Sequence, residues 1–167
     1  MLEPKLIILD EPTAALDVSV QATIVNLLNK LKREKGLSYL FITHDLGLVE
    51  RIADRVLVMY LGEIVESGPV ADVFYDTQHP YTRALLDSIP SLDPNKRDSL
   101  QALNGEVPSA MDKPVGCAFQ SRCQRVSNQC IHAHPELSAE GDNHASACFH
   151  PLTFNQPQII RAVGGSD

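Results

Sequence analysis

Residues 6–17 read LIILDEPTAALD, a stretch that begins with four consecutive apolar residues followed by two carboxylates. A continuous apolar run predicts a strand that is buried on both faces, as in a parallel sheet covered by helices. The proline and threonine that come next end this strand, and Asp17 is typical of a residue that caps a following helix. The stretch therefore predicts an interior strand with Asp10 and Glu11 at its carboxyl end.

The residues after Asp17 predict an amphipathic helix that ends at Gly36. Basic residues crowd its last turns, where they suit the helix dipole. Its apolar residues recur at helical spacing and are expected on one buried face. These apolar positions are Val20, Ile24, Leu27, Leu28 and Leu31.

The alternation of strands and helices continues to residue 89. The pattern predicts a strand at 38–43, a short helix through residue 52, strands at 55–59 and 63–66, and short helices at 69–75 and 80–88. A turn at Leu61-Gly62 joins the third and fourth strands. Because the order is strand, helix, strand, helix and hairpin, it indicates α/β architecture.

The composition and periodicity of the sequence change after residue 89. Pro, Asp, Asn and Ser crowd residues 90–99, and the periodicity fades. We therefore predict a partial α/β domain at 1–89 and a smaller, irregular region at 90–167. The second region has only a modest number of apolar residues with which to form a core. We therefore expect a cross-link or a metal to hold its shape.

Composition limits the classes of function. The chain has 167 residues, 44% of them apolar, and a net charge of −7. The acidic balance argues against a nucleic-acid binder, which needs a basic face to release counterions. No run approaches the roughly 18 apolar residues that cross a bilayer, and the N-terminus has no signal-peptide pattern. Composition therefore predicts a soluble, cytosolic protein that does not bind nucleic acid.

Polar side chains follow two successive predicted strands. In open α/β sheets, ligands gather at the carboxyl ends of strands, where Asp10, Glu11 and His44 are expected. The chemistry that suits them is phosphoryl transfer from a nucleotide to water. One carboxylate would hold Mg²⁺, the other would orient the attacking water and accept its proton, and the imidazole would steady charge on the terminal phosphate. Taken singly, the acid pair also suits a solvated loop or helix cap, and the histidine a structural role.

Together these residues resemble three motifs of ABC-transporter ATPase subunits. Residues 6–13, LIILDEPT, resemble the Walker B segment, residues 15–17 the D-loop, and residues 43–45 the switch-histidine loop. The one mild departure is Ala14, where many relatives have Ser. The resemblance implies the C-terminal part of a P-loop NTPase core with a small cysteine-containing extension.

The same resemblance implies a role for each candidate residue and the cofactors ATP and Mg²⁺. Asp10 would serve Mg²⁺, usually through water, and Glu11 would be the general base. His44 would contact the γ-phosphate. Asp17 would lie at a dimer interface and couple the two ATP sites.

Further stretches resemble the dipeptide/oligopeptide importer branch of this family. The most telling is HPYTRALL at 79–86, followed by Ser-Ile-Pro at 88–90. Similar stretches lie at 18–22, 60–66, 116–119 and 122–123. The resemblance thus covers nearly all of the chain and implies an ATPase subunit that couples ATP hydrolysis to peptide uptake.

Several motifs of this family are not in the sequence. The phosphate-binding loop, GxxxxGK followed by Ser or Thr, carries most of the phosphate contact in relatives. That loop, the adenine-stacking aromatic, the Gln loop and an LSGGQ-type signature are absent. We therefore expect this chain alone to bind ATP negligibly and to hydrolyse none.

The four cysteines all lie after residue 116, at Cys117, Cys123, Cys130 and Cys148. A cytosolic chain disfavours disulfides. Zinc usually uses a paired C-x2-4-C knuckle, which is absent, although the histidines at 132, 134, 144 and 150 could complete a site. An iron–sulfur cluster tolerates irregular spacing, and free thiols also fit. The family resemblance implies a 4Fe–4S cluster with a structural role.

The resemblance also implies partners. A complete subunit would pair head to tail with a homologous ATPase subunit and dock on two membrane-spanning permease subunits. An extracytoplasmic peptide-binding protein would act indirectly, and the subunit would lie at the cytoplasmic face of the inner membrane. The rival interpretations are a catalytically dead, metal-binding or regulatory remnant and a folded remnant with no activity.

Overall fold

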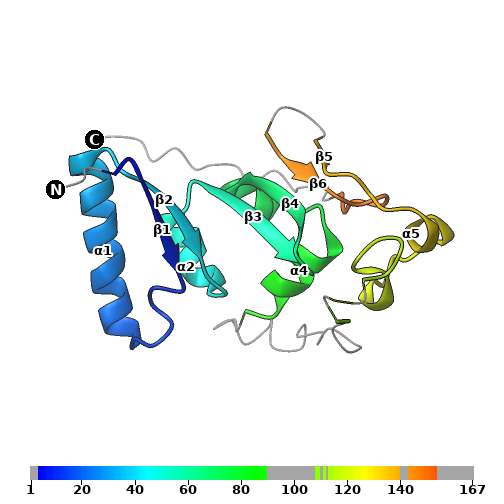
Figure 1. Ribbon diagram of the computed structural model, residues 1–167, viewed down its shortest axis with the longest axis horizontal. Coiled ribbons are helices and arrows are strands. Elements are labelled where there is room, and N and C mark those ends of the chain that lie inside the picture. The colour runs from blue at the N-terminus through cyan, green and yellow to red at the C-terminus, as the bar shows by residue number, and fades with distance from the viewer. Residues whose placement is uncertain (1–3, 90–107, 110, 112, 140–142, 154–167) are drawn as a thin grey trace, which may run out of the picture. The chain divides into compact units, whose positions relative to one another are not determined.

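The computed structural model describes residues 4–89, 108–109, 111, 113–139 and 143–153 (Figure 1). The chain divides into two compact units, Met1–Val56 and Leu57–Asp167. None of the helices in these described ranges is long and apolar enough to span a membrane.

The first unit is a strand–helix–strand–helix arrangement. Its elements are β1 (Leu6–Asp10), α1 (Val18–Lys35), β2 (Ser38–Ile42) and α2 (Leu46–Ile52). The two strands pair in parallel, with Leu6 opposite Ser38 and Asp10 opposite Ile42. Because parallel neighbours need a crossover connection, α1 lies between them in sequence. The predicted α/β architecture is confirmed here.

Helix α1 begins and ends where the sequence predicts. Asp17 caps it by accepting hydrogen bonds from the backbone N–H groups of Ser19 and Val20, at 3.0 and 2.9 Å. Gly36 ends it in the left-handed conformation, at φ 62°, which costs glycine no steric clash. Both caps therefore follow from residue type.

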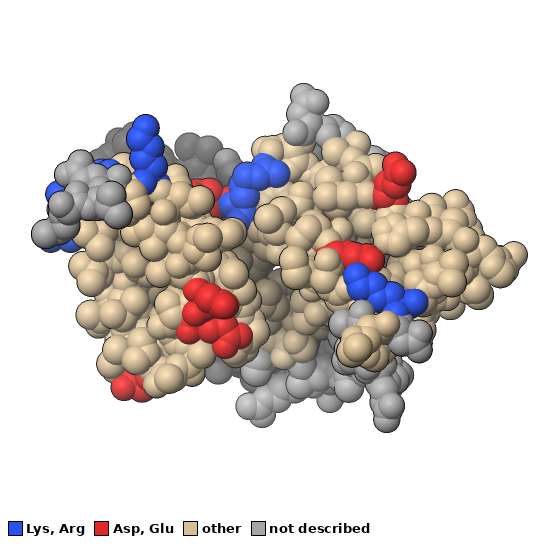
Figure 2. Space-filling view, viewed as in Figure 1, with Lys and Arg blue, Asp and Glu red and all other residues tan. Residues whose placement is uncertain are grey.

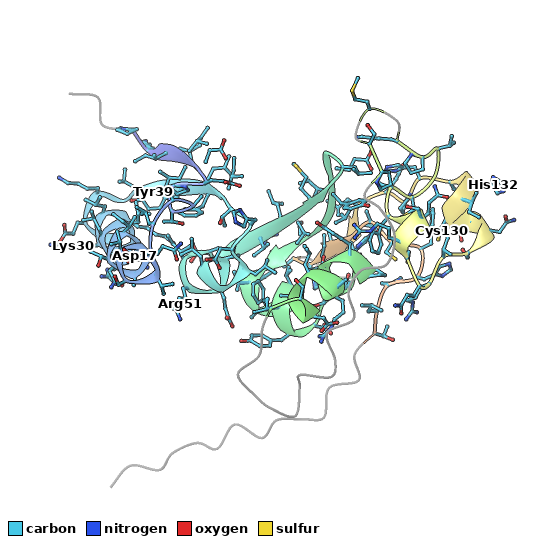
Figure 3. All side chains as sticks on the ribbon, turned by 90° about the horizontal axis from the view of Figure 1, so that it is seen from below. Asp17, Lys30, Tyr39, Arg51, Cys130 and His132 are labelled. Carbon is cyan, nitrogen blue, oxygen red and sulfur yellow. The ribbon has the colours of Figure 1, made fainter. Side chains whose placement is uncertain are left out.

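The predicted buried face of α1 is only partly correct. Among the described residues of this helix, Val25 is the buried one, whereas Val20 and Leu27 are 40% and 49% exposed. The Tyr39 hydroxyl donates to the Leu28 carbonyl at 3.1 Å, which identifies the side of α1 that faces β2 (Figure 3). A helix that covers only a narrow pair of strands buries a narrow stripe, and Val20 and Leu27 fall outside it.

The prediction that β1 is buried on both faces is wrong for the described part of the chain. Exposure alternates along β1 and β2, and the exposed positions are largely apolar. These apolar positions, which we call the open face, are Leu6 (55%), Ile8 (63%), Leu40 (43%) and Ile42 (47%). In the first unit α1 covers one side of the pair, so alternate residues stay exposed on the other.

The second unit contains a mixed set of short elements. Its sheet has the order β3-β4-β6-β5. The strands are β3 (Arg55–Tyr60), of which residues 57–60 belong to this unit, β4 (Glu63–Pro69), β5 (Ser138–Ala139) and β6 (Ala145–Ser146). The helices are α3 (Val70–Tyr75), α4 (Pro80–Asp87), the 3-10 helix η2 (Gln120–Arg122) and α5 (Asn128–His132).

The predicted hairpin of β3 and β4 is confirmed. Leu61 and Gly62 both have positive φ, at 47° and 78°, as in the two-residue turns whose twist matches that of the flanking strands. Strand β4 then pairs antiparallel with β6, with Glu66 opposite Ser146.

An aromatic cluster lies in the second unit. The ring of Tyr60 lies 4.6 Å from that of Tyr81 and 5.4 Å from that of Phe119. The cluster joins β3, α4 and the cysteine-containing segment in one core. The boundary predicted near residue 89 stays a prediction, because residues 90–107 lie outside the described ranges.

Candidate functional site

The carboxyl ends of β1 and β2 bring Glu11 and His44 together. The strands are parallel and in register, and the Glu11 N–H donates to the Ile42 carbonyl at 2.9 Å. His44 Nδ1 lies 3.1 Å from Glu11 Oε1, although 33 residues separate them in sequence. Both side chains are well exposed, at 77% for His44 and 51% for Glu11. A carboxylate and an imidazole are thus presented to one approaching ligand.

Asp10 is the last residue of β1 and is exposed beside Glu11. Its position opposite Ile42 puts it at the same edge of the strand pair. The structure therefore groups all three predicted residues at one edge, while their catalytic roles stay predictions.

The backbone at Glu11 is strained. Its φ is 44°, in the left-handed region that non-glycine residues rarely occupy. The turn is held by a hydrogen bond from the Ala14 N–H to the Glu11 carbonyl at 3.2 Å. Thr13 is buried, and its carbonyl accepts from Gln21 Nε2 at 3.1 Å. Backbone strain of this kind concentrates at functional sites. A glutamate at this position does not by itself predict a positive φ.

Asp17 has a structural role in the first unit. Besides the two backbone bonds, its Oδ1 accepts from the Ser19 hydroxyl at 2.6 Å. This hydroxyl, followed by the Val20 N–H, lowers the pKa of Asp17 below its usual range. The capping interaction accounts for an aspartate here, and the predicted role at a dimer interface stays a prediction.

Asp45 fixes the start of α2 directly after His44. Its Oδ1 accepts from the Leu48 N–H at 3.1 Å, and its own N–H donates to Thr43 Oγ1 at 3.0 Å. These local hydrogen bonds hold the residues on both sides of His44. The backbone conformation of residues 43–45 is therefore fixed by contacts within this segment and the start of α2.

The four cysteines lie in the second unit and are free thiols. Cys117 and Cys130 are buried, whereas Cys123 and Cys148 are half-buried. The Cys117 N–H donates to the Cys130 carbonyl at 2.8 Å, which ties the first cysteine to α5. Figure 3 labels Cys130 on this short helix.

Gly116 permits this close approach. A Cβ atom at this position would lie 2.1 Å from the Cys130 carbonyl oxygen and 2.6 Å from that of Ile131. Those contacts are with backbone, which cannot move aside without shifting α5. The sequence Gly-Cys at 116–117 is therefore a packing requirement of the cysteine segment.

Burial and neighbouring cysteines raise the pKa of three of the four thiols. Burial raises the pKa of Cys117 and Cys123, and raises that of Cys148 to about 11. A backbone hydrogen bond to each of these three sulfurs lowers its pKa in part, whereas negative charge on neighbouring cysteines raises it, and for Cys148 all three other cysteines contribute. The thiols of Cys117, Cys123 and Cys148 are thus protonated at neutral pH unless a bound metal displaces the protons.

Within the described ranges, no three His, Cys, Asp or Glu side chains are grouped so as to hold a single metal ion. The predicted ligand set Cys117, Cys123, Cys130 and Cys148 therefore stays a prediction. Two backbone N–H groups do point at sulfur, since Arg125 donates to Cys123 Sγ and His150 to Cys148 Sγ, each at 3.4 Å.

Sequence reasoning missed a buried polar cluster around Glu66. This carboxylate is 0% exposed and accepts from the N–H groups of Gln78 and His79, at 2.7 and 3.0 Å. His144 Nε2 lies 2.8 Å from Glu66 Oε1, so β4 is linked to the segment before β6. The signal available was a glutamate that directly follows the apolar pair Ile64-Val65 in β4.

His79 also has a structural role that the sequence did not reveal. Its Nδ1 accepts from the Tyr81 N–H at 3.1 Å and so caps α4, whose first residue is Pro80. Burial lowers the pKa of His79 to about 4, so the side chain is neutral at pH 7. For the HPYT stretch the sequence predicted a helix start, and family identification was the one functional meaning that it suggested.

Charged side chains are dispersed on the face drawn in Figure 2. Within each unit, the part of this face that is not drawn in grey is mostly uncharged, and it shows no broad basic patch.

Comparison with known proteins gives the same family resemblance as the sequence motifs. Residues 65–130 match the family model described as the oligopeptide/dipeptide transporter, C-terminal region. The chain is 49% identical over 150 residues to the dipeptide transport ATP-binding protein DppF of Haemophilus influenzae, covering 90% of this chain and 46% of that protein. It is 51% identical over 152 residues to the oligopeptide transport ATP-binding protein OppF of Escherichia coli, covering 89% and 45%. The chain thus spans about half the length of these relatives, and the resemblance inferred from its motifs is confirmed.

Proposed function

We propose that this chain forms the C-terminal part of the ATP-binding subunit of a dipeptide or oligopeptide ABC importer. In the complete protein, that subunit couples ATP hydrolysis to peptide uptake. The observation that carries the proposal is the 3.1 Å contact between Glu11 Oε1 and His44 Nδ1 at the carboxyl edge of two parallel strands. The similarity to peptide-transport ATP-binding proteins over about nine-tenths of the chain supports it.

The chemistry assigned to the site divides among three side chains. Mg²⁺, when bound through Asp10 and water, neutralises phosphate charge. Glu11 orients the attacking water and accepts its proton, which requires a carboxylate within hydrogen-bond reach of that water. His44 donates a hydrogen bond to the terminal phosphate. Contact with Glu11 restricts the imidazole, so the two groups are positioned together.

ATP hydrolysis also needs a phosphate-binding loop and a signature motif, and this sequence contains neither. Backbone N–H groups and a lysine of that loop carry most of the phosphate contact in P-loop proteins, and the sequence contains no such loop. This absence favours the second candidate function for the chain by itself, a catalytically inactive metal-binding or regulatory module.

Two measurements separate these functions. The purified 167-residue chain should show no Mg²⁺-dependent ATP binding by calorimetry, and micromolar affinity would contradict our account of the missing loop. In a complete subunit that contains this chain, Glu11→Gln should retain ATP and stop turnover. Hydrolysis at the unsubstituted rate would remove Glu11 from the role of general base.

The proposed partners follow from the importer assignment. A homologous ATPase subunit would pair head to tail, with Asp17 at the interface. Two membrane-spanning permease subunits would hold the pair at the cytoplasmic face of the inner membrane, and an extracytoplasmic peptide-binding protein would act through them. Cross-linking through a cysteine introduced at Ala15, beside Asp17 in the first unit, would test the head-to-tail pairing.

For the second unit we propose a 4Fe–4S cluster held by Cys117, Cys123, Cys130 and Cys148. The donor set supports it, because these are four unbridged, half-buried or buried thiols, and neighbouring cysteines raise the pKa of three of them. Backbone N–H groups directed at two of the sulfurs are typical of sites that stabilise thiolate ligands. The cluster, when bound, would cross-link a small core.

Anaerobic purification tests this site against its rivals. The cluster predicts a brown protein with stoichiometric iron and sulfide. A colourless chain with one zinc would establish the zinc alternative, and a folded chain with neither metal would leave free thiols.

A further inference from the structure

Ser127 and His150 form a bridge between two parts of the cysteine region. His150 Nε2 lies 2.7 Å from Ser127 Oγ, across 23 residues of sequence. Ser127 Oγ in turn lies 3.5 Å from Cys130 Sγ. At the other end, the His150 N–H donates to Cys148 Sγ at 3.4 Å. A continuous series of contacts therefore runs from Cys148 through His150 and Ser127 to Cys130.

The position of Ser127 makes this series unusual. Ser127 stands at the N-cap of α5, where a serine hydroxyl ordinarily accepts from a backbone N–H of the first turn. Here it makes no such cap bond. Its hydroxyl is directed instead to the sulfur of Cys130 and the ring of His150. The usual reason for a serine at a helix start therefore does not account for this one.

We propose that Ser127 and His150 are positioning residues of the four-cysteine site. With a proton on Nε2, His150 donates to Ser127 Oγ, which leaves the serine hydroxyl hydrogen free to donate to Cys130 Sγ. The same histidine holds its own backbone N–H against Cys148 Sγ, so one residue orients two ligands. The inference rests on the proposed metal site, and neither residue acts as a ligand in it.

The expected consequence is a metal site with a higher reduction potential and slower metal loss. Hydrogen bonds to a ligand sulfur withdraw charge from it and raise the reduction potential of an iron–sulfur centre. Residues that orient metal ligands typically change metal affinity about 10–100-fold when they are removed. The bridge also fixes the segment after Cys148 to the start of α5, so that the last cysteine is held near the other three.

The experiment uses the whole 167-residue chain, purified and reconstituted without oxygen. We expect Ser127→Ala and His150→Ala to lower the reduction potential and to speed iron loss to a chelator by about 10-fold or more. Ser127→Thr and His150→Gln keep a hydroxyl and an N–H donor, so they should restore much of both properties. Ser121→Ala is the matched control, because Ser121 is an exposed serine in η2 between Cys117 and Cys123.

A second readout needs no metal. In the reduced, metal-free chain, Ser127→Ala should increase the alkylation rates of Cys130 and Cys148 by iodoacetamide, measured by mass spectrometry, relative to Cys117. Unchanged potential, iron loss and alkylation in both alanine variants would overturn the bridge while leaving the cluster in place. An unsubstituted chain that takes up no iron would instead overturn the proposed cluster, and the alkylation rates would then decide the bridge alone.

Discussion

The buried side chain of His79 makes the stability of the second unit depend on pH. Burial lowers its pKa to about 4, whereas an unfolded histidine titrates near 6.5. Between these values the unfolded chain binds more protons than the folded chain, so stability falls as pH drops from about 6.5 to 4. The full shift corresponds to about 3 kcal/mol, by the conversion of pKa units to free energy.

We predict that His79→Asn removes this slope. Asparagine keeps an acceptor for capping α4 but does not titrate. The effect is measured by urea unfolding of both proteins at intervals between pH 4 and 7. The difference between their free energies of unfolding isolates His79, because the contributions of carboxylates that titrate in both proteins cancel. Parallel stability curves for the two proteins would mean that His79 is not the group responsible.

Glu66 makes a second prediction at the scale of one residue. Glu66→Ala leaves two buried backbone N–H groups and the His144 ring without their acceptor. Because each unsatisfied buried group costs about 1–3 kcal/mol, we expect a loss of at least about 3 kcal/mol in the free energy of unfolding. Glu136→Ala, at an exposed glutamate of the same unit, should stay within about 0.5 kcal/mol. Similar losses in both variants would contradict the role of the buried cluster.

At the scale of elements, the caps of α1 give the clearest test. Gly36 has φ 62°, and a Cβ added there would meet no described atom within 4 Å, so strain alone opposes a side chain. We expect Gly36→Ala to cost about 1–2 kcal/mol, the usual penalty for the left-handed region. Gly47→Ala, within α2, should be neutral or stabilising by up to about 1 kcal/mol. Thermal unfolding followed by circular dichroism compares them, and equal effects would refute the conformational argument.

These elements also show what the sequence could and could not predict. Asp17, Gly36 and the Leu61-Gly62 turn are local signals, so the limits of α1 and the hairpin could be predicted from residue type. The pairing of Glu66 with Ser146 depends on contacts between segments far apart in the chain, and β6 is too short to show a period. The approach of Glu11 to His44 was predictable, because parallel strands share an edge, but the positive φ of Glu11 was not.

At the scale of the whole molecule, the open face shows that apolar content alone does not determine burial. Its four residues alternate along β1 and β2, and the register places Ile8 directly opposite Leu40. The run LIIL predicted a strand covered on both sides, and the first unit supplies α1 for one side. Contiguous exposed apolar surface of this kind favours association or aggregation.

We therefore predict that the isolated chain self-associates through the open face. Ile8→Thr with Leu40→Thr places β-branched residues that suit strands while adding polar groups to the exposed side. This double variant should raise the concentration at which light scattering appears, and should elute from a sizing column nearer the monomer position. Leu27→Thr is the control, since Leu27 is an exposed leucine on α1 outside the open face. In a complete subunit the same double substitution should instead lower the melting temperature, if further elements cover these residues there. An unchanged scattering threshold in the isolated chain would show that the open face does not drive its association.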